Sequence, residues 1–198
     1  MFLIPEFELS VWNAWVFMVY VVLCNFLPYL LAGKLIDENA LNRLATVDTP
    51  QTDTEKRLLN VYSALFFGMV AYSIFLPLKI CTNWFIAGAV IYIAGVLVET
   101  TSIMNFLTTP ADKPVNKGIY HISRNPMYFG MFLIFIGTSI ACASFFFLVL
   151  TALFMVISHL VVVSEERHCS KKYGDPYQNY LNKIPRWIGI PKSSKNED

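Results

Sequence analysis

Three short polar segments in the second half of the chain contain the residues whose types and spacing could do chemistry. Residues 118–130 are basic and aromatic and lead into a long apolar run, and Glu165 and Glu166 follow that run directly. Residues 173–187 then place tyrosines at i, i+4 and i+7 and end near an arginine. Since residues at this spacing share one face of a helix, polar groups from all three segments are expected at the ends of apolar helices.

The negative charges of the adjacent residues Glu165 and Glu166 need nearby positive charge to compensate them. At the C-terminal end of a helix they oppose the helix dipole, which is already negative there. A cationic ligand would neutralise Glu165 and Glu166, and so would an amphipathic continuation of the helix with partners at i+4. The basic residues that follow are Arg167, His168, Lys171 and Lys172.

The other two segments also have explanations without chemistry. Arg124 would then lie among lipid head groups, with Tyr120 and Tyr128 in the aromatic belt of the interface. Asn125 suits the N-cap of a helix that starts at Pro126, because proline is well placed in a first turn.

The tail would be an interfacial helix. Its tyrosines, Tyr173, Tyr177 and Tyr180, would rest on the membrane surface, with Trp187 as a further anchor. Glu99 and His159 are polar residues inside apolar runs. Such residues are candidates for function, although a hydrogen-bonded structural role is the more frequent one for a histidine, and a hydrogen bond to a neighbouring helix would also explain Glu99.

Composition limits the class of protein. Hydrophobic residues make up 56% of the 198 residues and charged residues 15%, with a net charge of +1. Soluble domains carry about 25% charged residues, so we expect an integral membrane protein without nucleic-acid partners. The four cysteines have no C-x-x-C spacing, and we expect free thiols, no disulfide and no metal. The N-terminus has no basic start for a cleavable signal peptide.

The apolar runs predict an all-α protein of about five membrane spans. Met127–Ser164 has 38 residues without a charge, about 57 Å as one helix, which is nearly twice the hydrocarbon thickness. It should therefore be a hairpin that turns near residues 142–144. The other expected spans are Val11–Ala32, Leu59–Leu78 and residues 82–107, the last two forming a second hairpin.

Charge predicts the orientation. With the N-terminus outside, the inner segments 33–58, 108–126 and 165–198 hold fourteen of the fifteen basic residues. This distribution follows the positive-inside rule and places the C-terminus and all three polar segments on the cytoplasmic face. Glycine pairs at 88 and 95, and at 130 and 137, each share a helix face and favour close helix packing.

Together the three segments resemble the signature of the isoprenylcysteine carboxyl / phospholipid methyltransferase family, over about residues 113 to 191. That signature reads G-x-Y-x-x-x-R-H-P-x-Y-x-G, then a helical hairpin, E-E, and a Y-G-x-x-Y-x-x-Y tail ending near an arginine. The matching residues are Gly118, Tyr120, Arg124, Pro126, Tyr128, Gly130, Glu165, Glu166, Tyr173, Gly174, Tyr177, Tyr180 and Arg186.

The resemblance implies S-adenosylmethionine as cofactor and a lipophilic methyl acceptor from the bilayer, an isoprenylcysteine carboxylate or a phospholipid amine for example. It implies that Val115, Gly118 and Tyr120 lie near the adenosine. The head of the fourth span and the acids would complete the cofactor site, through Arg124, Asn125, Pro126, Tyr128, Glu165 and Glu166. Protein partners are not indicated.

The implied catalytic residues are Arg186, Glu166 and Asn125. Arg186 would orient an anionic acceptor, whereas an amine acceptor would need a base, for which Glu166 and His159 are candidates. Asn125 replaces the usual histidine of the signature; it can form hydrogen bonds but cannot act as a base at neutral pH.

Two other classes of protein remain open at this point. One is an NADPH-dependent enzyme of the sterol-reductase type, which shares the C-terminal arrangement but is usually about twice as long. The other is a membrane scaffold without activity. For the methyltransferase we expect one membrane domain, with the first three spans in residues 1–112, a cofactor-binding methyltransferase core in 113–191 and a disordered tail in 192–198.

Overall fold

The computed structural model describes residues 10–30, 40, 42 and 52–190. Within these residues the chain forms six α-helices, one 3-10 helix and no strand, apart from an isolated bridge between Asn13 and Pro77. The all-α prediction is confirmed. The helices are α1 (Trp15–Leu30), α3 (Asp53–Ser73), α4 (Asn83–Leu107), η1 (Gly118–His121), α5 (Pro126–Ala141), α6 (Phe145–Tyr173) and α7 (Asp175–Lys183). The tail expected to be disordered, 192–198, lies outside the described residues.

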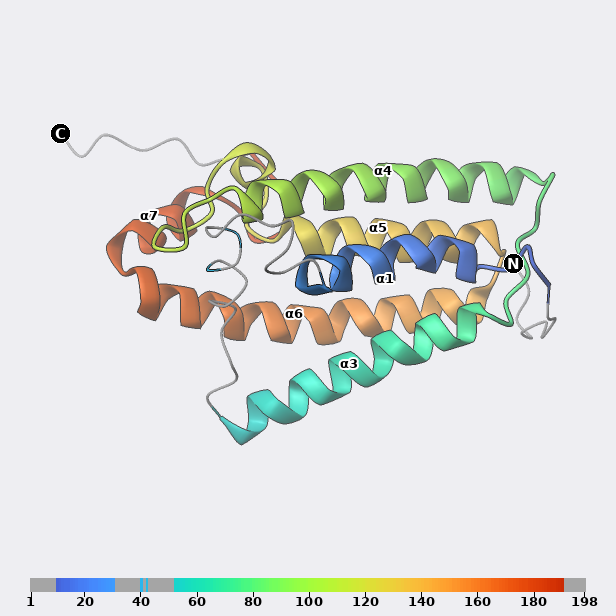
Figure 1. Ribbon diagram of the computed structural model, residues 1–198, viewed down its shortest axis with the longest axis horizontal. Coiled ribbons are helices and arrows are strands. Elements are labelled where there is room, and N and C mark those ends of the chain that lie inside the picture. Colours follow the sequence, from blue (N-terminus) through green and yellow to red (C-terminus); the bar gives the residue numbers. More distant parts are fainter. Residues whose placement is uncertain (1–9, 31–39, 41, 43–51, 191–198) are drawn as a thin grey trace.

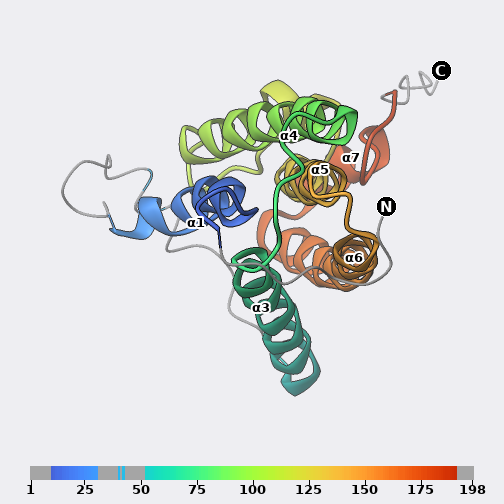
Figure 2. The ribbon, with the colours of Figure 1, turned by 90° about the vertical axis from the view of Figure 1, so that its right-hand side faces the viewer.

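The helices form a bundle with α5 at its centre. α4 packs along α5, α5 packs against α6, and α3 packs against α6 on the other side (Figures 1 and 2). The core is rich in aromatic rings; Phe135, Phe147 and Phe154 are fully buried there. The expected hairpin of the second and third spans is wrong, because residues 74–82 cross the end of the bundle and separate α3 from α4.

Glycines set the close approach of α4 to α5. A Cβ on Gly95 would lie 2.8 Å from the Gly130 carbonyl oxygen, and one on Gly137 would lie 2.5 Å from the Tyr92 backbone nitrogen. A Cβ on Gly88 would collide with the backbone of α5. Each helix therefore turns the glycine face predicted from the sequence toward the other, as small residues allow in membrane helix pairs.

The long apolar run Met127–Ser164 is interrupted by a turn near residues 142–144, as its length predicted. α5 ends at Ala141, Ala143 adopts a left-handed conformation with φ of 49°, and Ser144 caps α6 by accepting a hydrogen bond from the Phe147 N–H. The C-terminal hairpin is thus confirmed.

Two helices, α4 and α6, are long and apolar enough to cross a membrane, and α1 and α5 are apolar but shorter. Large apolar side chains follow the outer face of α4 and are exposed: Trp84, Ile86, Val90, Ile93, Leu97 and Met104. Such a face is suited to hydrocarbon.

The polar segments gather at one end of the bundle. η1, the start of α5, the end of α6 and α7 lie together there, opposite the turns at 74–82 and 142–144 (Figure 1). α6 does not stop at Ser164 but continues past the two acids to Tyr173, and its last turn contains Lys171 and Lys172. These lysines suit the negative end of the helix dipole.

Candidate functional site

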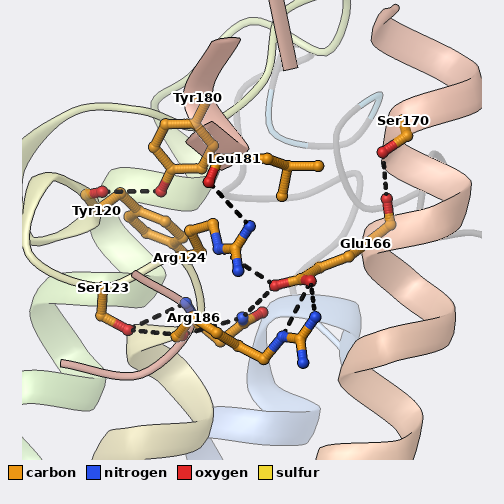
Figure 3. A network of polar contacts seen from close by, with 9 residues as sticks. Tyr120, Ser123, Arg124, Glu166, Ser170, Tyr180, Leu181 and Arg186 are labelled. Atoms are coloured by element: carbon orange, nitrogen blue, oxygen red, sulfur yellow. Dashed lines mark hydrogen bonds and ion pairs between the residues drawn. The ribbon is translucent and has the colours of Figure 1, made fainter. Parts of the chain in front are cut away.

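The buried carboxylate of Glu166 is the centre of the site. Arg186 donates two hydrogen bonds to its Oε2, from Nε at 3.0 Å and Nη2 at 2.8 Å. On the other oxygen, Asn125 donates from Nδ2 at 3.1 Å, and the Arg124 Nε lies 3.4 Å away as an ion pair (Figure 3). Three segments that are far apart in the sequence therefore meet at one side chain.

The two neighbouring acids have different surroundings. Glu166 is 6% exposed, whereas Glu165 is exposed and accepts a hydrogen bond from the Tyr128 hydroxyl at 2.8 Å. Glu166 is thus the acid that faces inward. Because two arginines face this single carboxylate, the group retains a net positive charge.

Two of the expected neutralising residues next to the acids, Arg167 and His168, contact Glu55 instead. His168 is buried and its Nε2 lies 3.3 Å from Oε1 of Glu55 at the start of α3, while Arg167 lies 3.9 Å from the same oxygen. Ser164 also donates to Glu55, at 2.7 Å. These contacts join α3 to α6 and leave Glu166 to the arginines.

The segment before α5 is held by the tail. The Arg124 N–H donates to the Pro185 carbonyl at 3.0 Å, and Arg124 Nη1 donates to the Leu181 carbonyl at 3.4 Å. Ser123 Oγ accepts from the Asn125 N–H at 3.1 Å and donates to the Arg186 carbonyl at 3.3 Å.

Asn125 precedes the helix as predicted, and Pro126 lies in its first turn, buried. The expected side-chain cap is nevertheless wrong. Asn125 makes no capping hydrogen bond, because its Nδ2 is directed at Glu166 and at the Arg186 carbonyl, 3.2 Å away.

Two of the three tail tyrosines, Tyr177 and Tyr180, are buried in the protein, and Tyr173 is partly buried. Tyr177 and Tyr180 form an apolar cluster with Val115, Tyr120 and Ile184, and the Tyr180 hydroxyl donates to the Tyr120 carbonyl at 2.7 Å. Burial raises the pKa of both tail phenols well above the ordinary range, so both remain neutral hydrogen-bonding groups.

Trp187 likewise points into the bundle. Its ring packs on Phe132 and lies 5.9 Å from the ring of His159. Tyr173 donates to the Ala111 carbonyl at 3.4 Å. These aromatic side chains therefore contact the protein, and the position of the tail helix at a membrane interface stays a prediction.

Gly118 occupies a position that only glycine fits easily. Its φ is +59°, and a Cβ there would collide with the side chain of Asn105 from α4. Sequence reasoning missed Asn105, as well as Ser123 and Glu55. Each acts through a contact with a distant segment, and no local spacing marks it.

Glu99 lies away from the Glu166 group. It is 2% exposed on the face of α4 that packs against Gly130. Within the described part of the chain, no group of three or more His, Cys, Asp and Glu residues is placed to hold a metal ion.

Comparison with known proteins identifies the family. The family profile described as phospholipid methyltransferase matches residues 78–176, half of the chain, from the residues before α4 to the start of α7. No curated protein and no solved structure matches the chain. The chain belongs to the phospholipid methyltransferase family, as the sequence signature indicated. This family and the apolar helices make it a membrane methyltransferase.

Proposed function

We propose that the protein is an S-adenosylmethionine-dependent methyltransferase that acts on a lipophilic acceptor in the membrane. The observation that carries the proposal is the group around Glu166, where Arg124, Asn125 and Arg186 converge on one buried carboxylate. These residues come from the segments that match the family signature, and the family supports methyl transfer as the reaction.

The residues at this end of the bundle fit the cofactor. The Nδ2 of Asn105 is buried without a hydrogen-bond partner among the described residues and lies beside Gly118. We place the adenosine at this position, next to Val115 and Tyr120. The net positive charge of the Glu166 group suits the carboxylate of the cofactor, which we assign to Arg124. The other proposed cofactor residues border the same site and are Asn125, Pro126, Tyr128, Glu165 and Glu166.

Each polar residue of the group has a proposed task. Glu166 fixes both arginines, and Arg186, which is partly exposed, orients an anionic part of the acceptor. Asn125 connects Glu166 to the tail through its two hydrogen bonds. When bound, S-adenosylmethionine supplies the methyl group, whose carbon is already attached to a good leaving group. The chain then needs only to hold the acceptor in line and exclude water, a task to which the buried tail tyrosines and Trp187 are suited.

We further propose that α1, α3, α4, α5 and α6 all cross the membrane, with the N-terminus outside and the site and C-terminus on the cytoplasmic face. The proposal is supported by the alternating directions of these helices and by the concentration of basic residues at the site end.

The acceptor enters from the bilayer and is either an isoprenylcysteine-like carboxylate or a phospholipid-like group. The NADPH-dependent reductase and the inactive scaffold are both disfavoured by the family.

Calorimetry with detergent-purified protein tests the proposal. S-adenosylmethionine should bind saturably and NADPH should not. The Glu166→Gln variant should lose at least about tenfold in affinity, since it weakens a buried charge-assisted group. Asp112→Asn removes an exposed acid at the same end of the bundle and should bind as the wild type does. Binding of NADPH, or of neither nucleotide, would reject the proposed function.

A further inference from the structure

A second buried carboxylate joins α3 to α6 close to the Glu166 group. Glu55, in the first turn of α3, is 9% exposed. Its Oε1 accepts a hydrogen bond from the Ser164 hydroxyl at 2.7 Å and lies 3.3 Å from the Nε2 of His168. A buried carboxylate keeps such partners, because moving away would leave its charge unpaired in an apolar interior. Glu55 is therefore a fixed point of attachment between the two helices.

Glu55 is itself held firmly at the start of α3. The Thr52 hydroxyl accepts a hydrogen bond from the Glu55 N–H at 3.2 Å, and Glu55 Oε2 accepts one from the Thr52 N–H at 3.1 Å. This reciprocal pair is a capping box, which fixes the first turn of a helix. The two carboxylate oxygens thus have separate contacts, since Oε2 completes the cap and Oε1 reaches α6.

The residues of α6 that contact Glu55 lie on either side of Glu166 in the sequence. Ser164 precedes Glu166 by two residues and His168 follows it by two, and two residues correspond to roughly 200° around the helix axis. Glu166 therefore points away from α3, toward α5 and the tail. A rotation of α6 that turned Glu166 out of the site would have to break the contacts with Glu55.

α3 also contacts the residue that binds the outer acid. The ring of Tyr62 lies 6.3 Å from the ring of Tyr128 in an edge-on arrangement, and the Tyr128 hydroxyl donates to Glu165. Tyr62 also packs 4.9 Å from the ring of Phe154 on α6. The part of α6 that carries both acids is thus supported by α3 at more than one place.

We infer that Glu55 is a positioning residue for the cofactor site. Through Ser164 and His168 it sets the rotation of α6 that directs Glu166 at the arginines. The inference rests on the proposed function, in which the Glu166 group binds S-adenosylmethionine. The paired hydrogen bonds from Arg186 need a defined orientation of the carboxylate, so a small rotation of α6 disrupts them.

This contribution comes from a part of the chain outside the family match. α3 ends at Ser73, whereas the profile matches residues 78–176. The signature residues of the Glu166 group are therefore held in place by a helix that the profile does not include.

Calorimetry with full-length protein in detergent measures S-adenosylmethionine affinity, and thermal unfolding of the same samples measures stability. Glu55→Ala should weaken the affinity by about fivefold or more, because it removes a buried charged acceptor. Glu55→Gln keeps an oxygen that can accept from Ser164 and should recover part of the loss. Ser164→Ala removes one hydrogen bond of the same contact and should also weaken binding.

Two matched variants separate positioning from the stability of α3. Thr52→Ala removes the hydroxyl of the same capping box but keeps Glu55, so the midpoint should fall while the affinity stays within about twofold of the wild type. Asp53→Asn removes an exposed acid of the same turn and should bind as the wild type does. Equal losses of affinity in Thr52→Ala and Glu55→Ala would overturn the inference.

A double-mutant cycle tests whether Glu55 acts through Glu166. In the Glu166→Gln background, Glu55→Ala should weaken binding by less than about twofold, since coupled residues have non-additive effects. The same factor in both backgrounds would contradict the inference. Glu55→Gln replaces Glu55→Ala in the cycle if the latter does not fold, and unchanged affinity in both Glu55→Gln and Ser164→Ala would also overturn it. Failure of the wild type to bind S-adenosylmethionine would instead reject the proposed function.

Discussion

Glu166 and Glu165 differ in role because α6 turns one acid into the bundle and the other outward. The inward acid meets two arginines and an amide, while the outward acid meets the Tyr128 hydroxyl. Buried charges persist when they are paired and hydrogen-bonded. The pairing also fixes the arginine side chains. The contacts that stabilise the buried charge of Glu166 therefore also prepare the site for an anionic ligand.

Asn125→Asp tests the environment of Glu166. The substitution keeps the shape of the side chain but replaces a donor 3.1 Å from Glu166 with a second carboxylate. We expect lower stability than in Asn125→Ala, which only removes hydrogen bonds worth about 1–3 kcal/mol when buried. Thermal unfolding in detergent measures both, and equal midpoints would contradict the arrangement. Asn125→His, which retains a donor, should fall between the wild type and Asn125→Ala.

Arg186→Lys tests the paired hydrogen bonds. Lysine keeps the charge but cannot present two donors in a planar fork. The unfolding free energy should fall by about 1–2 kcal/mol, and S-adenosylmethionine affinity should fall with it. Lys172→Arg, an exposed exchange at the same end of α6, serves as the control; an equal loss there would show that the effect is not specific to Arg186.

At the scale of the elements, the glycine faces of α4 and α5 allow backbone contact along the two helices. Gly137→Ala should lower the unfolding free energy by about 1–3 kcal/mol, the usual cost of overpacking, because the new Cβ would lie 2.5 Å from the Tyr92 nitrogen. Gly68→Ala on α3 meets nothing within 4 Å and should raise stability by about 0.5–1 kcal/mol through helix propensity. Chemical denaturation measures both, and a loss at Gly68 equal to that at Gly137 would refute the interpretation.

Gly174 joins α6 to α7 in a conformation that other residues rarely adopt, with φ of 59° and ψ of −137°. Gly174→Ala has room for its Cβ and yet should cost about 1–3 kcal/mol through backbone strain. The same change should weaken S-adenosylmethionine binding, since α7 carries the buried tyrosines. Normal affinity with lowered stability would show that α7 does not shape the site.

Local sequence patterns predicted where helices and turns lie better than they predicted which helices pack together. The turn at 142–144 follows from the length of the uncharged run, and the glycine spacing identified the packed faces. The pairing of α3 with α6 did not follow, because it depends on Glu55 meeting Ser164 and His168 across more than a hundred residues. The sequence likewise predicted one site that contains Arg124, Asn125, Glu166 and Arg186. It did not predict which of these side chains contact one another, because those contacts also join distant segments.

At the scale of the whole molecule, cysteine labelling tests the number of spans. Cys81 is exposed between α3 and α4, and Cys169 lies near the end of α6, at the opposite end of the bundle. If α4, α5 and α6 all cross the membrane, a membrane-impermeant maleimide added to intact cells should label Cys81, and Cys169 only after permeabilisation. Labelling of both from one side would mean that an even number of these three helices crosses the membrane. Cys81→Ser supplies the control for the outer signal.

The position of Arg186 in the chain also sets the order in which the site can form during synthesis. Arg124 and Asn125 leave the ribosome first, and Arg186 follows 62 residues later, roughly 3–12 s at ordinary translation rates. Until then Glu166 has only part of its donors, and the nascent bundle carries an incompletely neutralised acid. Assembly of the site is therefore a late event in biogenesis, and a ribosome stalled between α6 and α7 would leave the helices in place without a binding site.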